Sequence, residues 1–212
     1  MLFCQLLFVN PKFYLIWIVM VFISIWIHEC AHALTAKHFG DDTAVRGHYL
    51  IPNPIKLMGI PAIISLLVIG ITWGSVPVDY RKLRKGRMPP MLVALAGPLS
   101  NLVQYLFFCL AGILILKFAG GGVENDLFQM MSIGAVLNIV LFVLNLIPVP
   151  PLDGWIVSLC LFPGIARINQ ELRNGVILGI FVLVFFSFGY LFTYGQHAVV
   201  FTMRLFAYFF GI

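Results

Sequence analysis

Two histidines and a glutamate stand together in the chain as His28-Glu29-Cys30-Ala31-His32, which reads HExxH. On a helix, residues four apart lie on one face, so His28 and His32 can present two imidazoles to one metal ion. Neutral imidazoles at this spacing bind tetrahedral Zn²⁺, and Glu29 beside them is placed to act as a general base. The motif predicts hydrolytic zinc chemistry; the structural alternative is a histidine pair bonded to helix carbonyls.

Two histidines leave a zinc ion short of ligands, so a third must come from elsewhere in the chain. Asp153 is the candidate, because it closely follows an apolar segment across a proline break and is expected on the same side of the membrane. Its alternative role is to cap a short helix that starts at Gly154. We expect His38, His48 and His197 not to be ligands. The prediction is one zinc ion per chain, with the fourth position left for water.

The HExxH motif directly follows an apolar run that suits a lipid bilayer. Within residues 13–27, Ser24 is the one residue that is neither aliphatic nor aromatic. The whole chain is 61% hydrophobic and 10% charged, whereas soluble domains carry about 25% charge. Glu29 is the one acidic residue inside an apolar span, and ionisable groups at membrane depth are usually functional. The composition predicts an integral membrane protein that hydrolyses its substrate within, or just beneath, the bilayer.

The hydropathy pattern predicts an all-α polytopic bundle with about five spanning helices, because several apolar segments approach the ~20 residues that a span requires. We expect a single domain over 1–212, with helices at 12–39, 91–118, 127–147, 175–194 and 197–210, a loop or small membrane-side β-hairpin at 41–59, an apolar segment at 60–76 and a basic loop at 77–90. The apolar segment is short and contains Pro61, which favours a re-entrant segment packed against protein. A short true span is the alternative.

Charge predicts the orientation of these elements. The loop 77–90 holds five Lys and Arg residues and should be cytoplasmic, which places the acidic turn 119–126 outside. The net charge of +5 is clustered. It therefore indicates the membrane topology and contacts with lipid headgroups, and it does not indicate nucleic-acid binding. We therefore expect a multi-pass protein of the cell (inner or plasma) membrane with its active site toward the cytoplasm and the lipid bilayer as a partner.

Three motifs in order make the chain resemble the site-2 protease family of intramembrane zinc metalloproteases. They are HExxH at 28–32, Ala-Gly-Pro-Leu-Ser-Asn at 96–101, and Asn-Leu-Ile-Pro-Val-Pro-Pro-Leu-Asp-Gly at 145–154. The stretch 76–85 is similar to the compact prokaryotic branch, which lacks PDZ and CBS domains. The resemblance implies an endopeptidase that cuts a transmembrane protein or peptide near the cytoplasmic side, as in regulated intramembrane proteolysis.

The resemblance also implies roles for particular residues. His28, His32 and Asp153 would ligate the zinc ion, Glu29 would be the catalytic base, and Asn145 would hold the substrate or the oxyanion.

The second motif would supply close helix packing through Gly97, next to Pro98, and a polar contact through Asn101. Gly154 completes the third motif. Trp155 stands where relatives often carry a second glycine, which would narrow access to the site.

Two other functions use the same residues. A metal-binding membrane transporter would need a polar path on both sides of the site, and the outer part of 12–39 is apolar. A catalytically silent scaffold is the second alternative, and the intact Glu29 argues against it. For the protease, we expect strands in 41–58 to capture the unwound substrate by strand addition. The substrate, an adaptor and the oligomeric state have no signature in the sequence.

Overall fold

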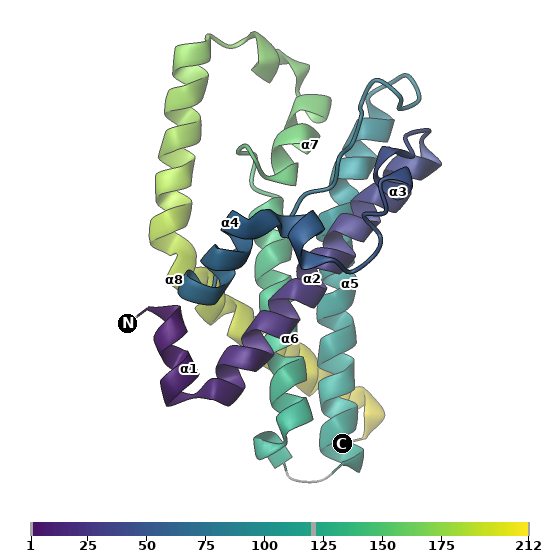
Figure 1. The fold of residues 1–212 in the computed structure, drawn as a ribbon. Helices are drawn as coiled ribbons and strands as arrows, with labels where there is room; N and C mark the ends of the chain where they lie inside the picture. The colour runs from purple at the N-terminus through teal and green to yellow at the C-terminus, as the bar shows by residue number, and fades with distance from the viewer. Residues whose placement is uncertain (1, 120–121, 212) are drawn as a thin grey trace.

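The computed structural model describes residues 2–119 and 122–211, and these residues contain helices and no strand. The helices are α1 (Leu6–Val9), α2 (Pro11–His38), α3 (Thr43–Arg46), α4 (Pro54–Ile69), α5 (Met88–Phe118), α6 (Asp126–Asn145), α7 (Asp153–Leu161) and α8 (Gln170–Phe210). Short 3-10 turns lie at Phe3–Gln5, Gly122–Glu124 and Pro163–Arg167. The long helices α2, α5 and α6 run side by side at the centre (Figure 1).

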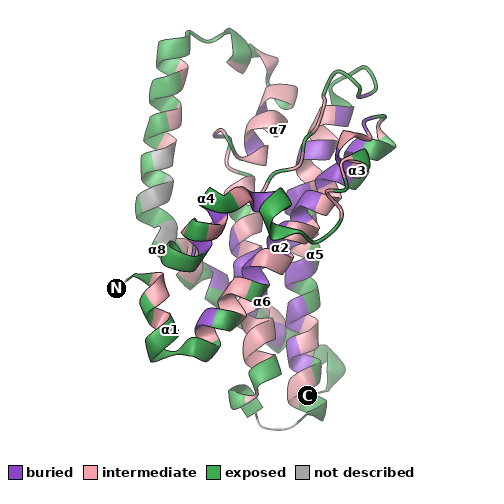
Figure 2. Cartoon of the chain, viewed as in Figure 1, coloured by how far each residue is buried: buried purple, intermediate pink, exposed green. Residues whose placement is uncertain are grey.

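Among the described residues, α2, α5 and α6 are the three helices long and apolar enough to cross a membrane. Their buried faces meet in one apolar core, to which α4 and α8 also contribute. Figure 2 places many of the buried residues on the three central helices and exposed ones along much of α8. The core includes Met20, Ile25, Leu66, Phe108, Ala135 and Val199. The expectation of a helical membrane protein is confirmed, while the count of about five spanning helices and the re-entrant segment stay predictions.

Asparagines define where four of the helices begin. Asn10, Asn53, Asn125 and Asn169 each precede a helix and accept a hydrogen bond from a backbone N–H of its first turn. Such caps satisfy donors that have no partner within the helix. Helices α2 and α4 also carry proline at their first position, where its missing N–H costs nothing.

Of the loop or small β-hairpin expected at 41–59, the hairpin is wrong, because these residues contain no strand. Residues 43–46 form the short helix α3, and α4 already begins at Pro54. The pair Asn53-Pro54, which looked like part of a loop, is a helix start in which the Asn53 side chain accepts from the Lys56 N–H. Strand addition by 41–58 therefore has no strand to act through.

The apolar segment expected at 60–76 divides into a helix and an extended stretch. Helix α4 is broken at Gly59 (φ 75°, ψ 164°) and ends at Gly70, whose φ of 83° suits a left-handed C-cap. The helical part after the break, residues 60–69, is about 15 Å long at about 1.5 Å per residue, half of a bilayer core of about 30 Å. Residues 71–79 then run without helical structure toward the site.

Helix α8 is one continuous helix over 170–210, so the expected division into 175–194 and 197–210 is wrong. The expected helices left out positions 195 and 196, but Gly195 does not interrupt α8, and a glycine inside a helix costs only about 1 kcal/mol. Here it also serves packing, because a Cβ at Gly195 would lie 3.1 Å from Val140 Cγ2 of α6. In Figure 1 the upper part of α8 stands apart from α7, and its lower part crosses behind α6.

Candidate active site

His28, His32 and Asp153 converge near the C-terminal end of α2. Their ligand atoms lie within 4.8 Å of one another, and this is the one such group of three among the described residues. The two Nε2 atoms are 3.0 Å apart. Asp153 Oδ2 lies 3.2 Å from His28 Nε2, and Oδ1 lies 3.3 Å from His32 Nε2. Two helices far apart in the sequence thus present three ligand atoms to one point.

Asp153 does not act as a helix cap. The cap position of α7 is Leu152, without a side-chain hydrogen bond, and Asp153 is the first residue of the helix. The other histidines, His38, His48 and His197, are exposed and lie outside the group.

The hydrogen bonds of the two rings leave their Nε2 atoms free for a metal. His28 Nδ1 lies 2.6 Å from Asn101 Oδ1, and His32 Nδ1 lies 2.7 Å from the Val93 carbonyl oxygen. Both partners are acceptors, so each Nδ1 carries the proton and each neutral Nε2 offers a lone pair. The buried Asp153 Oδ2 has no hydrogen-bond partner. Lone pairs that face lone pairs repel unless a cation lies between them, so this donor set fits Zn²⁺.

Gly97 is required by the histidine rings themselves. A Cβ at this position would lie 2.6 Å from His28 Nε2 and would also overlap His32 Nε2. The close packing expected at Gly97 is therefore contact between α5 and the two imidazoles. Pro98 follows it inside α5 and cannot donate to the Ala94 carbonyl.

Gly154 lets α7 begin against the end of the preceding turn. A Cβ there would lie 2.5 Å from the Ile147 carbonyl oxygen, so glycine allows the approach that sets Asp153 in place. Trp155 lines neither cavity near the site. It lies two residues after Asp153, which turns it about 200° around the helix, so the expected narrowing of access is not found.

Two cavities meet at the site. The first, of 280 Å³, is lined by the three ligand residues, Glu29, Asn145 and five residues between positions 74 and 80, namely Gly74, Ser75, Val76, Val78 and Tyr80. The second, of 630 Å³, shares His28, Glu29 and Asn145 but is otherwise mostly apolar, and it extends to Trp17 of α2 and Phe192 of α8. Glu29 is 7% exposed and lines both. The smaller, more polar cavity therefore continues into a larger apolar one.

Asn145 lies at the junction of these cavities at the end of α6. Its Nδ2 donates to the Leu141 carbonyl of the same helix at 3.0 Å. Asn145 is outside the ligand group, in keeping with a role toward the substrate, which stays a prediction.

The extended stretch 71–79 passes directly beside Glu29. A Cβ at Gly74 would lie 2.6 Å from Ile25 Cγ2 and 3.5 Å from Glu29 Oε1, so glycine permits this approach. The Ser75 N–H bonds to the Leu57 carbonyl oxygen at 3.0 Å and ties the stretch to α4. This part of the chain forms one wall of the smaller cavity.

Tyr80 is a site residue that the motifs did not indicate. It lines the smaller cavity. The residue is 46% exposed, but its phenol is partly desolvated, which raises the pKa of Tyr80, and the negative charge of Asp153 raises it further. The phenol thus keeps its proton at neutral pH and can donate a hydrogen bond into the cavity. The basic residues of its loop indicated only the membrane topology, and the spacing of the motifs did not link Tyr80 to the metal ligands.

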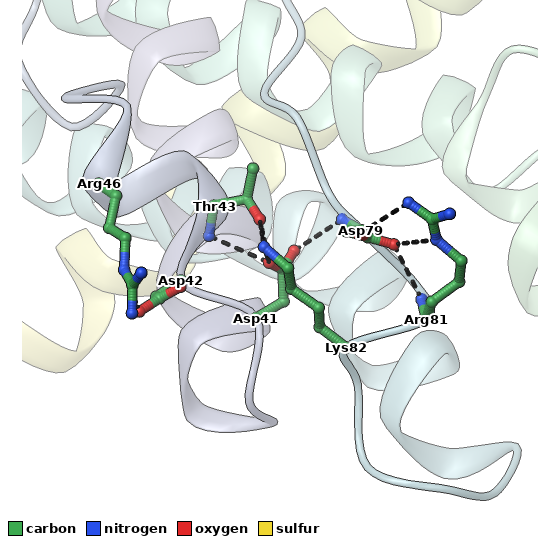
Figure 3. A network of polar contacts seen from close by, with 7 residues as sticks. All are labelled: Asp41, Asp42, Thr43, Arg46, Asp79, Arg81 and Lys82. Atoms are coloured by element: carbon green, nitrogen blue, oxygen red, sulfur yellow. Dashed lines mark hydrogen bonds and ion pairs between the residues drawn. The ribbon is translucent and has the colours of Figure 1, made fainter.

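Asp41 fastens the end of the extended stretch to the end of α2 (Figure 3). The side chain is 1% exposed. It accepts from the Thr43 N–H and hydroxyl and from the Asp79 N–H at 2.7 Å, and Lys82 Nζ lies 3.9 Å away. Burial alone would raise the pKa of Asp41, but the bonds from Thr43 and Asp79 and the charge of Lys82 hold it below its ordinary value.

Asp41→Ala is expected to release residues 77–87 from the end of α2. A hydrogen-bonded buried carboxylate contributes about 1.5–3 kcal/mol per bond, so at pH 7 the variant should show faster hydrogen exchange and proteolysis in this loop. Because the folded pKa is lowered, the contribution is present above the ordinary pKa and is lost as pH falls through the folded value. The wild-type loop should therefore stay protected down to about pH 4.

Asp42→Ala is the matched control, because Asp42 pairs with Arg46 on the surface. Equal protection of 77–87 in the Asp41 and Asp42 variants would show that Asp41 does not anchor the loop.

Known proteins are similar to this chain in sequence. Over 176 residues the chain is 39% identical to the "Putative zinc metalloprotease YwhC" of Bacillus subtilis, which covers 79% of this chain and 78% of that protein. It is 34% identical over 140 residues to the "Putative zinc metalloprotease Rip2" of Mycobacterium tuberculosis, covering 63% of this chain and 52% of the relative. Rip2 of Mycolicibacterium smegmatis is 32% identical over 139 residues, 62% and 51% of the two chains. No protein-family profile and no solved structure matches the chain.

The fold and the site define a helical membrane protein with a candidate zinc centre. With the similarity to YwhC and Rip2, they support a zinc metalloprotease. The chain belongs to the site-2 protease family of zinc metalloproteases.

Proposed function

We propose that this protein is an intramembrane endopeptidase that uses one zinc ion to cleave membrane-spanning substrates near the cytoplasmic side. The observation that best supports this proposal is the convergence of three candidate metal ligands and Glu29 in one cavity at the end of an apolar helix. Counted from Phe13 at about 1.5 Å per residue, His28 lies about 22 Å along a core of about 30 Å. The site would then lie about 8 Å below the membrane surface, within reach of water.

The chemistry follows from the residues around the cavity. His28, His32 and Asp153 would hold zinc, which when bound supplies a Lewis acid that lowers the pKa of water to about 7. Glu29 takes the proton of the attacking water and passes it to the leaving amine. The Asn145 amide turns from the Leu141 carbonyl to donate to the oxyanion that develops on the substrate.

The substrate must reach this cavity as an extended chain, because a helix holds its carbonyls in internal hydrogen bonds. We assign its docking to residues 71–79 in place of 41–58. Gly74, Ser75, Val76 and Val78 of this stretch line the smaller cavity, and an extended backbone can pair with a second one by strand addition. The neighbouring apolar cavity would take apolar side chains beside the scissile bond.

A transporter would need a polar path that continues past the metal. The polar side chains on the far side of the site, Ser24, Asn101 and Asn138, are each 0% exposed and bond to one another. They close the interior and open no water path, which favours the protease over the transporter.

Cleavage should depend on the helix stability of the substrate. Placing Gly or Pro in a substrate span near the cytoplasmic side should speed cleavage, since they lower helix stability by about 1 and about 3 kcal/mol relative to Ala. Replacing natural helix breakers by Leu should slow it. The measurement is the cleavage rate of a matched series in reconstituted vesicles. Equal rates across the series would rule out unwinding as the selective step and point to a recognition surface.

The loop 77–90 should be cytoplasmic and residue 122 external. Single cysteines at positions 84 and 122, placed in a cysteine-free chain, would be treated with an impermeant thiol reagent in intact cells. We expect labelling at 122 alone, and at both positions after the cells are opened. Labelling of 84 but not 122 from outside would reverse the proposed orientation.

A further inference from the structure

A chain of polar side chains crosses the centre of the bundle beneath the metal-binding histidines. His28 Nδ1 donates to Asn101 Oδ1 at 2.6 Å, and Asn101 Nδ2 donates to Asn138 Oδ1 at 2.8 Å. Asn138 Nδ2 donates to Ser24 Oγ at 2.8 Å, and Ser24 Oγ donates to the Met20 carbonyl at 2.7 Å. The relay, which we define as His28, Asn101, Asn138 and Ser24, thus connects α2 to α5, α6 and α2 again.

The direction of the relay is set by backbone carbonyls, which cannot exchange donor for acceptor. Asn138 Nδ2 also donates to the Gly134 carbonyl at 2.9 Å. If the Asn138 amide were reversed, its oxygen would face that carbonyl, and two acceptors would meet. Asn138 Oδ1 is therefore held toward Asn101, which turns Asn101 Oδ1 toward His28.

This direction selects one tautomer of His28. An acceptor opposite Nδ1 keeps the proton there and leaves the Nε2 lone pair for a metal. His32 obtains the same result in one step, because its Nδ1 donates directly to the Val93 carbonyl. His28 has a side-chain amide as its partner, and an amide needs something further to orient it.

Glycine at position 134 brings the relay together. A Cβ there would lie 3.0 Å from the Phe108 ring and would overlap the end of Met20. Without a side chain, α6 approaches α2 and α5 closely enough for Asn138, one turn later, to reach both Ser24 and Asn101. All three polar side chains are 0% exposed, and a buried amide without partners is costly, so a complete set of bonds is needed.

We propose that Asn138 is a positioning residue for the metal centre: through Asn101 it fixes His28 in the tautomer and orientation that bind zinc. Asn138 lies outside the HExxH, GPxxN and Asp153 motifs and touches no metal-ligand atom. The inference rests on the proposed zinc site, and it adds a residue on a third helix to the groups that tune that site.

The test measures zinc affinity of the purified full chain by competition with a chelator. Asn138→Leu keeps the branched shape of the side chain and removes every polar atom, and it should weaken zinc binding by about 10–100-fold. With Co²⁺ as the probe, the visible absorption of the bound ion should change, because the ring of His28 is free to turn. Ile113→Ala is the control: this core residue of α5 is 5% exposed, lines neither cavity and is outside the relay, so its loss should lower thermal stability and leave zinc affinity unchanged.

A double-mutant cycle separates the relay from a general loss of packing. Once Asn101→Ala has cut the link to His28, Asn138→Leu should weaken zinc binding no further, whereas independent effects would multiply. Ser24→Ala is a milder variant that leaves Asn138 bonded to Gly134, and it should cost less than about tenfold.

Several outcomes would overturn the inference. They are wild-type zinc affinity in Asn138→Leu, or multiplied losses in the cycle. If Asn138→Leu does not fold, Asn138→Ala, which removes the same polar atoms without adding bulk, takes its place: wild-type affinity rejects the relay, and a loss that is absent in the Asn101→Ala background supports it. A wild-type chain that binds no zinc would instead reject the proposed metal site.

Discussion

Glu29→Gln protein is expected to bind one zinc ion per chain and to lose cleavage by about 10²–10⁴-fold, the usual contribution of a general base. Glutamine has almost the same size and shape, so the packing against Gly74 and Ile25 should remain. It cannot take a proton from water. Because Glu29 is outside the group of ligand atoms, its replacement should leave the metal in place.

The measurement pairs zinc content with the cleavage rate of a single-span substrate in vesicles. Natural substrates would be found as membrane proteins that accumulate in cells with the Glu29→Gln variant but not with wild type. The same cells carrying Asp42→Ala serve as the control, since that surface acid is remote from the chemistry. Cleavage by the Glu29→Gln protein at the wild-type rate would contradict the proposed mechanism, in which Glu29 is the general base.

Local spacing was enough to predict the part of the site that lies on one helix. His28 and His32 are four residues apart, and helix periodicity alone brings them to one face. Asp153 lies on a different helix, so its placement needed a further argument about charge, sidedness and the proline break. The structure brings its carboxylate to the two rings, and the role of ligand stays a prediction.

The missed parts of the fold depend on packing between distant segments. Nothing within 194–197 shows that Gly195 lies against α6, so a local turn signal was preferred over a continuous helix. In the same way, Asn and Pro are residue types that are common in loops, but in this structure Asn53 caps α4 and Pro54 is its first residue. Both signals take their meaning from the neighbouring segments in three dimensions, which local sequence does not encode by itself.

The relay was missed for a related reason. Ser24 stood out as the one polar residue in its apolar run, but its partner Asn138 is 114 positions away in the chain. A single polar residue in an apolar helix is as consistent with a local bond to its own backbone as with a bond across the bundle. The signal in the sequence is a set of single amide side chains in different apolar spans, among them Asn101 and Asn138, which together indicate bonds across the bundle.

Asp153→Ala is expected to abolish zinc binding and cleavage together. The two imidazoles would remain oriented by Asn101 and the Val93 carbonyl, but two neutral nitrogens do not form a complete zinc site. Loss of groups that only orient a ligand costs about 10–100-fold in affinity, so loss of the ligand itself should exceed this. The measurement is metal content after dialysis against a weak chelator, together with the rate of substrate cleavage.

Ser158→Ala is the matched control for this variant. Ser158 is 9% exposed on the same short helix, and its hydroxyl bonds only within α7, to the Trp155 carbonyl. It should keep zinc and activity. Full zinc occupancy in the Asp153→Ala protein would remove Asp153 from the ligand set, while loss of zinc in both variants would show that the integrity of α7, and not the carboxylate, was being measured. Loss in Asp153→Ala alone, with zinc retained by Glu29→Gln, would separate the residue that holds the metal from the residue that moves the proton.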